Sequence, residues 1–149
     1  MTSKYSVIIT KSIFDTKTIE RKIISLLKKT TKKILLFNTA LNEYDVQKLH
    51  KRIVAIAGEN YDNLKVYRFR GFEPTKRLEL IDYAIKTTEN LGYVFIDGIR
   101  DLSYKFNDIT HTHQIIKWID NRNIHLITTV CENQKEMYEY LLSKKNSEY

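Results

Sequence analysis

The stretch YVFIDGIRDL, residues 93–102, places four apolar or aromatic residues directly before an aspartate and a glycine. A continuous run of this kind is typical of a strand buried on both faces, as in a parallel sheet covered by helices. Asp97 then stands where the strand ends. Open parallel sheets bind their ligands at the carboxyl ends of the strands. The fold and the candidate chemistry therefore both depend on this stretch.

Similar apolar runs alternate with segments of helical spacing along the whole chain. We expect strands over residues 4–10, 33–37, 63–69, 93–96 and 124–130. We expect helices over residues 17–27, 42–58, 73–92, 112–122 and 132–145, with Gly58 and Gly92 as the stops of the second and third. This alternation predicts an α/β fold with three layers (αβα) and a five-stranded, mostly parallel sheet, in one domain that spans residues 1–149.

The composition is that of a soluble protein rich in regular structure. One proline and four glycines leave little material for long loops. The chain has no apolar run long enough for a bilayer and no secretory signal pattern, so we expect a cytoplasmic location without a membrane partner. The single cysteine, Cys131, excludes an internal disulfide and is expected to be a buried thiol. A net charge of +7 can attract nucleic acid, although a lysine-rich solvated surface explains it equally well.

The segment between the first strand and the first helix occupies the place of a phosphate-binding loop. That motif reads G-x-x-x-x-G-K-[ST]; Lys17 and Thr18 match its final pair, whereas Lys11 and Thr16 replace its glycines. The glycines matter because main-chain amides must wrap the phosphate in conformations that side chains hinder. Lys17 and Thr18 could still bind an anion weakly at the helix start. The pattern alone favours a plain helix start that is capped by Thr16 or Asp15.

Carboxylates near the strand ends have two interpretations each. Asp97 could hold a magnesium ion through water, or it could cap the turn DGIRD together with Gly98 and Asp101. Glu43 and Asp45 follow the second strand, where an ATPase often carries a carboxylate that orients water. Their distance from the strand end favours surface positions in the first turn of a helix instead.

The segment KVYRFRGFEPTKR, residues 65–77, interleaves aromatic with basic side chains. Aromatic rings and cations together suit single-stranded nucleic acid, and the alternative is a strand with a solvated basic rim. The candidate contacts to nucleic acid are Lys65, Arg68, Arg70, Lys76 and Arg77. No metal site is expected, because His111 and His113 do not share a helix face and lack further ligands.

Taken in order, four segments resemble the RecA-like ATPase domain of helicase and primase-helicase proteins, in the variety carried by mobile and conjugative elements of Bacteroidota. They are KILLFNTALNEYDVQKLHKRI, KVYRFRGFEPTKRLELIDYAI, LGYVFIDGIRDLSYKFND and NIHLITTVCENQ, all within residues 33–135. The resemblance implies a P-loop NTPase fold, with Asp97 as the Walker B aspartate and Lys17 and Thr18 as a degenerate Walker A motif. It also implies that the first strand lies beside the fifth. The later strands that flank it in the family have no counterpart here, so YSVII, residues 5–9, is expected to be an edge.

The sequence departs from the family where hydrolysis would take place. The family pattern after the second strand resembles F-D-T-E-Q, whereas this chain has FNTAL at residues 37–41, so Ala40 replaces the catalytic glutamate. After the fifth strand the family tends to read H-Q-N-K before a DNA-contact loop, and here residues 131–134 read CENQ. Together with the missing glycines, these departures imply that ATP hydrolysis has been abandoned. We expect no cofactor, or ATP and magnesium held only weakly.

The function we expect is that of a non-hydrolysing accessory or DNA-associated protein in a mobilisation, conjugative-element or replication module. Its expected partners are DNA and, through the edge strand, a second copy or a full-length RecA-like protein; the C-terminal helix around residues 137–142 is the alternative cover for that edge. Two other functions stay open. One is a weak ATPase or helicase-type motor that uses Lys17, Thr18, Asp97 and Glu43. The other is a single-stranded nucleic-acid-binding module.

Overall fold

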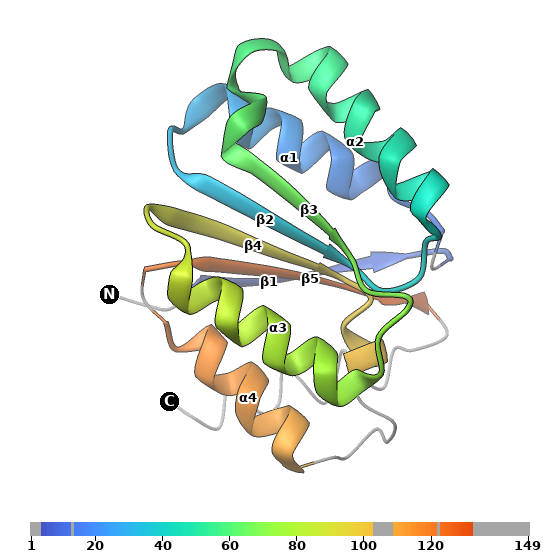
Figure 1. Cartoon of the computed structure of the whole chain (residues 1–149), viewed down its shortest axis with the longest axis vertical. Helices are drawn as coiled ribbons and strands as arrows, with labels where there is room; N and C mark the ends of the chain where they lie inside the picture. The colour runs from blue at the N-terminus through green and yellow to red at the C-terminus, as the bar shows by residue number, and fades with distance from the viewer. Residues whose placement is uncertain (1–3, 13, 103–108, 122, 133–149) are drawn as a thin grey trace.

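The structure is a computed structural model of the chain, and it describes residues 4–12, 14–102, 109–121 and 123–132. Strands and helices alternate through these residues, as the apolar runs predict. The elements are β1 (Lys4–Thr10), α1 (Lys17–Lys29), β2 (Lys33–Asn38), α2 (Glu43–Ala57), η1 (Gly58–Asn63), β3 (Leu64–Arg68), α3 (Pro74–Thr87), β4 (Leu91–Asp97), η2 (Ile99–Leu102), α4 (Ile109–Ile119) and β5 (His125–Cys131), where η denotes a 3₁₀ helix. Figure 1 shows one sheet between α1 and α2 on one face and α3 and α4 on the other. The three-layer α/β fold is therefore confirmed.

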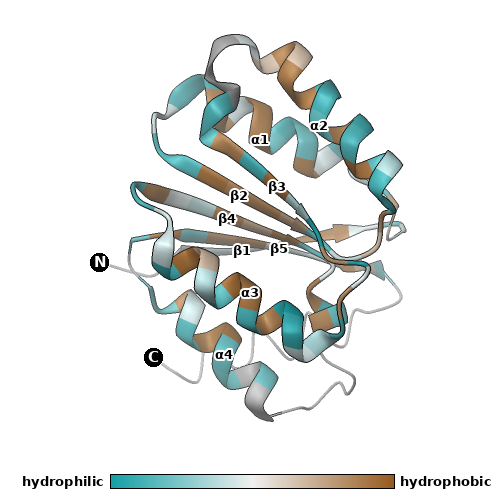
Figure 2. Ribbon diagram, in the orientation of Figure 1, coloured by the Kyte–Doolittle hydropathy of each residue, from teal (hydrophilic) through white to brown (hydrophobic). Residues whose placement is uncertain are grey.

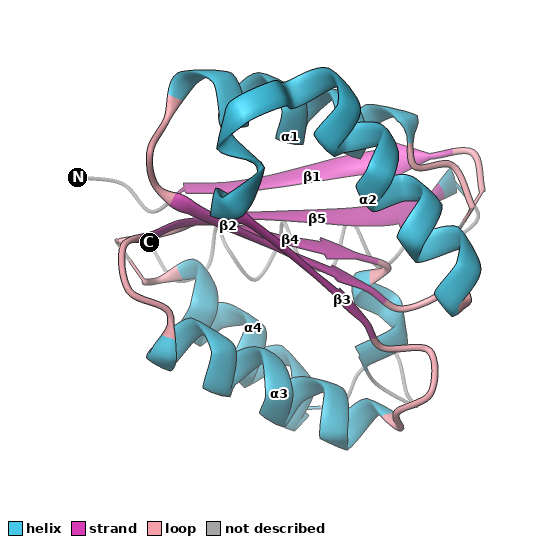
Figure 3. Ribbon diagram, turned by 45° about the horizontal axis from the view of Figure 1, so that its top comes forward, coloured by secondary structure: helices cyan, strands magenta, loops and turns pink. Residues whose placement is uncertain are grey.

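The five strands form one sheet in the order β1-β5-β4-β2-β3, and every neighbouring pair is parallel. In the described residues β1 and β3 are the two edges, and β4 lies at the centre between β5 and β2 (Figure 3). The register aligns Asn38 at the end of β2 with Asp97 at the end of β4. All five carboxyl ends consequently meet at one edge of the sheet.

The inner strands β2, β4 and β5 are buried because each carries apolar side chains toward both helical layers. In β2, Leu35 and Phe37 belong to the core beneath α3 and α4, whereas Ile34 and Leu36 belong to the core beneath α1 and α2. Figure 2 shows this apolar content along the central strands. Each fully buried side chain of this size contributes about 1.5–3 kcal/mol relative to an exposed position. Continuous apolar runs, rather than alternating ones, follow directly from this two-sided burial.

Helix boundaries agree with the predicted stops in one case and differ in the other. Gly58 follows α2 with a φ of 78°, as a helix-terminating glycine does. The predicted stop of α3 at Gly92 is wrong, because α3 ends at Thr87 and Gly92 lies inside β4. Asn90 makes the turn between them with a φ of 55°. Gly92 serves a different purpose, since a Cβ there would lie 2.8 Å from the side chain of Lys32.

The expected closing helix over residues 132–145, with residues 137–142, falls beyond Glu132 and so outside the described residues. Among the helices that the structure describes, none combines the length and apolar character needed to cross a membrane.

Candidate functional site

Asp97 ends the central strand β4, and its side chain is buried, with 5% of its surface exposed. Its two carboxylate oxygens bond to the strands on either side. Oδ1 accepts a hydrogen bond from Oγ1 of Thr129 in β5 at 2.7 Å, and Oδ2 accepts one from Nδ2 of Asn38 in β2 at 3.0 Å. The carboxylate is thereby tied across three strands of the sheet. Of its two predicted roles, the turn interpretation does not describe these bonds, which run to neighbouring strands.

Asn38 is fixed in its orientation by the loop that follows β2. Its Oδ1 accepts hydrogen bonds from the main-chain N–H groups of Ala40 and Leu41, at 3.1 and 2.8 Å. The amide nitrogen must then face Asp97, because the oxygen is already committed to the loop. Asn38 thus links the buried carboxylate to the loop that contains Ala40.

A second set of contacts joins Thr39 to the turn after β4. Oγ1 of Thr39 lies within hydrogen-bonding distance of the main-chain oxygen of Asp97, at 3.1 Å, and of Oδ2 of Asp101, at 3.0 Å. Gly98 has a φ of 101°, and a Cβ built there would collide with the Thr39 hydroxyl. Gly98 is a turn residue, as predicted, and Asp101 lies in the 3₁₀ helix η2 that follows it. We call Asn38, Thr39, Asp97, Asp101 and Thr129 the carboxyl-edge cluster.

Burial raises the pKa of Asp97 from its ordinary value to about 6. The nearby charges of Asp15 and Asp101 raise this pKa further, while the hydrogen bonds from Thr129 and Asn38 oppose the shift. The carboxyl edge of the sheet therefore holds a buried carboxylate with two further carboxylates, Asp15 and Asp101, near it. The thiol of Cys131, at the end of β5, is buried as predicted, and burial raises its pKa.

The loop between β1 and α1 bonds to itself. The main-chain N–H of Phe14 donates to Oγ of Ser12 at 2.9 Å, and that of Asp15 donates to the carbonyl oxygen of Ser12 at 3.1 Å. The N–H of Lys17, the first residue of α1, donates to the carboxylate of Asp15 at 3.3 Å. A phosphate in this loop would need these amides free. It would also meet the Asp15 carboxylate at the helix start.

The two Walker A candidates lie at the start of α1, with exposed side chains. Lys17 and Thr18 are thus exposed to solvent, whereas the carboxylate of Asp97 is buried. Thr16 is buried at the N-cap, where its hydroxyl donates to Oε2 of Glu20 at 2.6 Å and accepts no capping hydrogen bond from a main-chain amide. The plain helix start is therefore the arrangement observed, with the Asp15 side chain as the local acceptor.

Glu43 and Asp45 lie in the first turn of α2, as predicted. The N-cap of that helix is Asn42, whose side chain accepts a hydrogen bond from the N–H of Asp45 at 2.8 Å. Both carboxylates are exposed, where the helix dipole favours them.

The five basic candidates divide into three groups. Lys65 and Arg68 of β3 line a groove beside α3, and Arg70 is exposed in the loop after β3. Lys76 is exposed and lies 3.8 Å from Glu79. Arg77 is half-buried, and its guanidinium donates to the carbonyl oxygens of three residues, Phe69, Arg70 and Asp101, at 3.0, 3.4 and 2.6 Å. We therefore assign Arg77 to holding the β3–α3 loop against the turn after β4.

Sequence patterns missed the partners of Asp97. Asn38 and Thr129 stand at or near the ends of two apolar runs, which was the available signal, but their meeting depends on β4 lying between β2 and β5. His111 is buried and His113 exposed within α4. In the parts of the chain that the structure describes, histidine, cysteine and carboxylate side chains form no group of three that could hold a metal ion.

The carboxyl-edge cluster and the loop before α1 are thus a set of internal hydrogen bonds around one buried carboxylate. No protein-family model matches the chain, and no curated protein matches its sequence.

Proposed function

We propose that the protein is a RecA-like domain that does not hydrolyse ATP and acts as an accessory or DNA-associated protein of a mobilisation, conjugative-element or replication module. The observation that carries the proposal is the engagement of Asp97, whose two oxygens accept hydrogen bonds from Asn38 and Thr129 within the fold. A Walker B carboxylate acts on the water shell of a magnesium ion. Here both oxygens of the same carboxylate are engaged by side chains of the neighbouring strands.

The surroundings of Asp97 support the loss of hydrolysis in two further ways. The Asp15 carboxylate accepts the hydrogen bond of the first amide of α1, so negative charge already stands where a phosphate would bind. Ala40 follows Asn38 and Thr39 with a methyl group, which cannot orient or deprotonate a water molecule. Each feature opposes a different part of the reaction: phosphate binding, or activation of the nucleophile.

The arrangement of the strands supports the RecA-like kinship. The resemblance implies that the first strand lies next to the fifth, and in the structure β1 pairs with β5 along its whole length, from Lys4 with His125 to Thr10 with Cys131. In the described residues β1 has no strand on its other side. That is the expected position when the later strands of the family have no counterpart.

Calorimetric titration with ATP and magnesium, together with an ATPase assay, tests the proposal. We expect no saturable binding in the micromolar range and no turnover above background. Lys17→Ala should behave like the wild type, and Lys28→Ala, an exposed lysine at the other end of α1, is the matched control. Turnover that Lys17→Ala abolishes and Lys28→Ala keeps would overturn the proposal in favour of a weak ATPase that uses Lys17, Thr18, Asp97 and Glu43.

The biological setting has a separate test. A protein of a mobilisation or replication module is expected to be encoded beside other proteins of such a module. A gene neighbourhood without relaxase, primase, helicase or transfer functions, found repeatedly in different genomes, would contradict this part of the proposal.

A further inference from the structure

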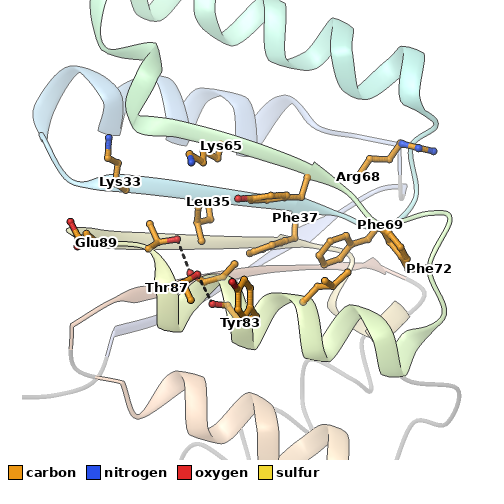
Figure 4. A pocket seen from close by; sticks show the side chains of 14 residues that line it. Lys33, Leu35, Phe37, Lys65, Arg68, Phe69, Phe72, Tyr83, Thr87 and Glu89 are labelled. Atoms are coloured by element: carbon orange, nitrogen blue, oxygen red, sulfur yellow. Dashed lines mark hydrogen bonds between the residues drawn. The ribbon is translucent and has the colours of Figure 1, made fainter.

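A groove of about 630 Å³ runs between the edge strand β3 and helix α3, on the face of the sheet that α3 and α4 cover. Its floor is formed by apolar side chains of β2, including Leu35 and Phe37. We call it the β3–α3 groove. Figure 4 shows Lys33, Lys65 and Arg68 at intervals along the two strands and Tyr83 on the α3 side of the groove, with the Arg68 side chain projecting away from α3.

Aromatic rings form a continuous series from the core to the mouth of the groove. Phe37 stacks on Tyr67 with ring centroids 5.1 Å apart and planes 14° from parallel, and Phe69 lies 5.1 Å from Phe37 on the other side. Phe72 extends the series by an edge contact with Phe69 at 6.0 Å. At the mouth, Phe72 is 44% exposed and Tyr83 is 68% exposed. Large aromatic surface so exposed beside a groove is typical of a binding site.

The strand side of the groove is positively charged. Lys33, Lys65 and Arg68 line it, and Glu89 is the carboxylate among the lining residues. The register pairs Ile34 with Leu64, so Lys33 lies one residue before the level of Leu64. From that level to Arg68 the three cations span about five residues of strand, or roughly 16 Å. A row of cations of this length matches an extended polyanion better than a single small anion. The chain's net charge of +7 adds long-range attraction to the same class of ligand.

We propose that the β3–α3 groove binds single-stranded nucleic acid, with bases stacked on Tyr83 and Phe72 and the phosphates along Lys33, Lys65 and Arg68. This inference rests on the DNA-associated part of the proposed function and deepens it by placing the contact. Stacking on aromatic rings accepts any base, and cations along the backbone supply affinity without sequence preference. Lys76 and Arg77 do not take part, since neither lines the groove and the guanidinium of Arg77 is engaged by three carbonyl oxygens.

Single strands suit the groove better than duplexes, because only unpaired bases expose their faces for stacking. A peptide is the competing occupant, since β3 is a sheet edge in the described residues. The row of cations favours the polyanion, and a peptide would have to be strongly acidic to match it.

Fluorescence anisotropy with labelled oligothymidylate and oligouridylate of about 15 nucleotides tests the proposal. We expect the wild-type chain to bind at about 50 mM salt and to weaken steeply toward 200 mM. Lys65→Ala with Arg68→Ala removes two phosphate contacts, so the slope of log K against log salt should fall by about 1.4. Tyr83→Ala should weaken binding by about 5- to 100-fold at an unchanged slope, because it removes stacking and no charge.

Matched controls separate the groove from general surface charge. Lys76→Ala and Tyr44→Ala remove an exposed cation and a tyrosine that is 67% exposed, both away from the groove, and should bind like the wild type. The ratio of affinities for the two oligonucleotides distinguishes DNA from RNA as the preferred ligand.

Three results would overturn the inference. They are no binding of oligonucleotides by the wild type at low salt, equal losses of affinity in the groove and control variants, or an acidic peptide bound in the groove that oligonucleotides do not displace. None of these depends on nucleotide hydrolysis. The ATP titration reports on the carboxyl edge of the sheet, so failure of the groove and failure of the non-hydrolysing assignment give different results.

Discussion

Asp97 is a buried carboxylate whose two oxygens accept hydrogen bonds from the strands on either side. Burial raises its pKa to about 6, well above the value of about 3.9 in an unfolded chain. Between these two pH values the unfolded chain has released the proton while the folded chain retains it. The free energy of unfolding that Asp97 contributes is therefore fully present below about pH 4 and is lost as the pH rises through about 6.

We predict that this loss amounts to about 3 kcal/mol between pH 4 and pH 7, from a shift of about two pKa units. Urea denaturation of the wild type and of Asp97→Asn at several pH values measures it as the difference between the two curves. The variant also brings its amide against that of Asn38, but this cost does not vary with pH. Parallel curves for the two proteins would contradict the prediction.

Gly98 is the residue at which backbone conformation and close approach coincide. Its φ of 101° disfavours any side chain, and a Cβ there would collide with Oγ1 of Thr39. We predict that Gly98→Ala lowers the free energy of unfolding by at least about 2 kcal/mol. Gly71→Ala is the control, because a Cβ at Gly71 meets no atom within 4 Å. Equal free energies of unfolding for the two variants in a denaturant titration would argue against the predicted strain at residue 98.

At the scale of the elements, the side chain of Arg77 binds the loop from β3 into α3. The guanidinium of Arg77 donates to carbonyl oxygens of Phe69, Arg70 and Asp101, and so connects this loop to the turn that follows β4. Lysine cannot reproduce these contacts, because its ammonium group is a single point rather than a planar fork. The loop that borders the β3–α3 groove therefore depends on an arginine that does not itself line the groove.

We predict that Arg77→Ala lowers the free energy of unfolding by about 2 kcal/mol, since three carbonyl oxygens lose a charged donor. Arg68→Ala is the matched control, because the Arg68 side chain is exposed, and its stability should stay within about 0.5 kcal/mol of the wild type. Thermal and chemical denaturation measure both. A larger loss in Arg68→Ala than in Arg77→Ala would reverse the assignment of the two arginines.

The pattern of apolar residues predicted every strand: β2, β4 and β5 are buried on both faces and read as continuous apolar runs, whereas the edge strand β3 was found from its alternation. The end of α3 was predicted incorrectly, since Gly92 makes room for Lys32 and this contact is invisible in a local pattern. Asp97 was identified as a candidate because it directly follows the apolar run of β4. Its partners Asn38 and Thr129 were not, because they reach it only through pairings between β2, β4 and β5 that no local segment encodes.

At the scale of the whole molecule, the described sheet ends at β1 with Ile9 47% exposed. An edge strand with an exposed apolar side chain can pair with a second chain. This supports the proposed contact with a second copy or with a full-length RecA-like protein.

We predict weak, concentration-dependent self-association that Ile9→Lys reduces, because a lysine on an edge opposes strand pairing. Ile56→Lys replaces an isoleucine that is 61% exposed on α2 and should associate like the wild type. Sedimentation equilibrium over a range of concentrations measures both variants. A wild-type chain that stays monomeric throughout would show that the edge needs no partner of its own kind.

The pairing of β1 with β5 also has a consequence for how the chain is made. Tyr5 and Thr128, whose hydroxyl groups meet at 3.2 Å, are 123 residues apart. At ordinary ribosomal speeds β1 waits roughly 6–25 s for its neighbour to be synthesised. The segments from α1 to β4 can assemble in that interval, so the first strand to leave the ribosome is the last to find its place.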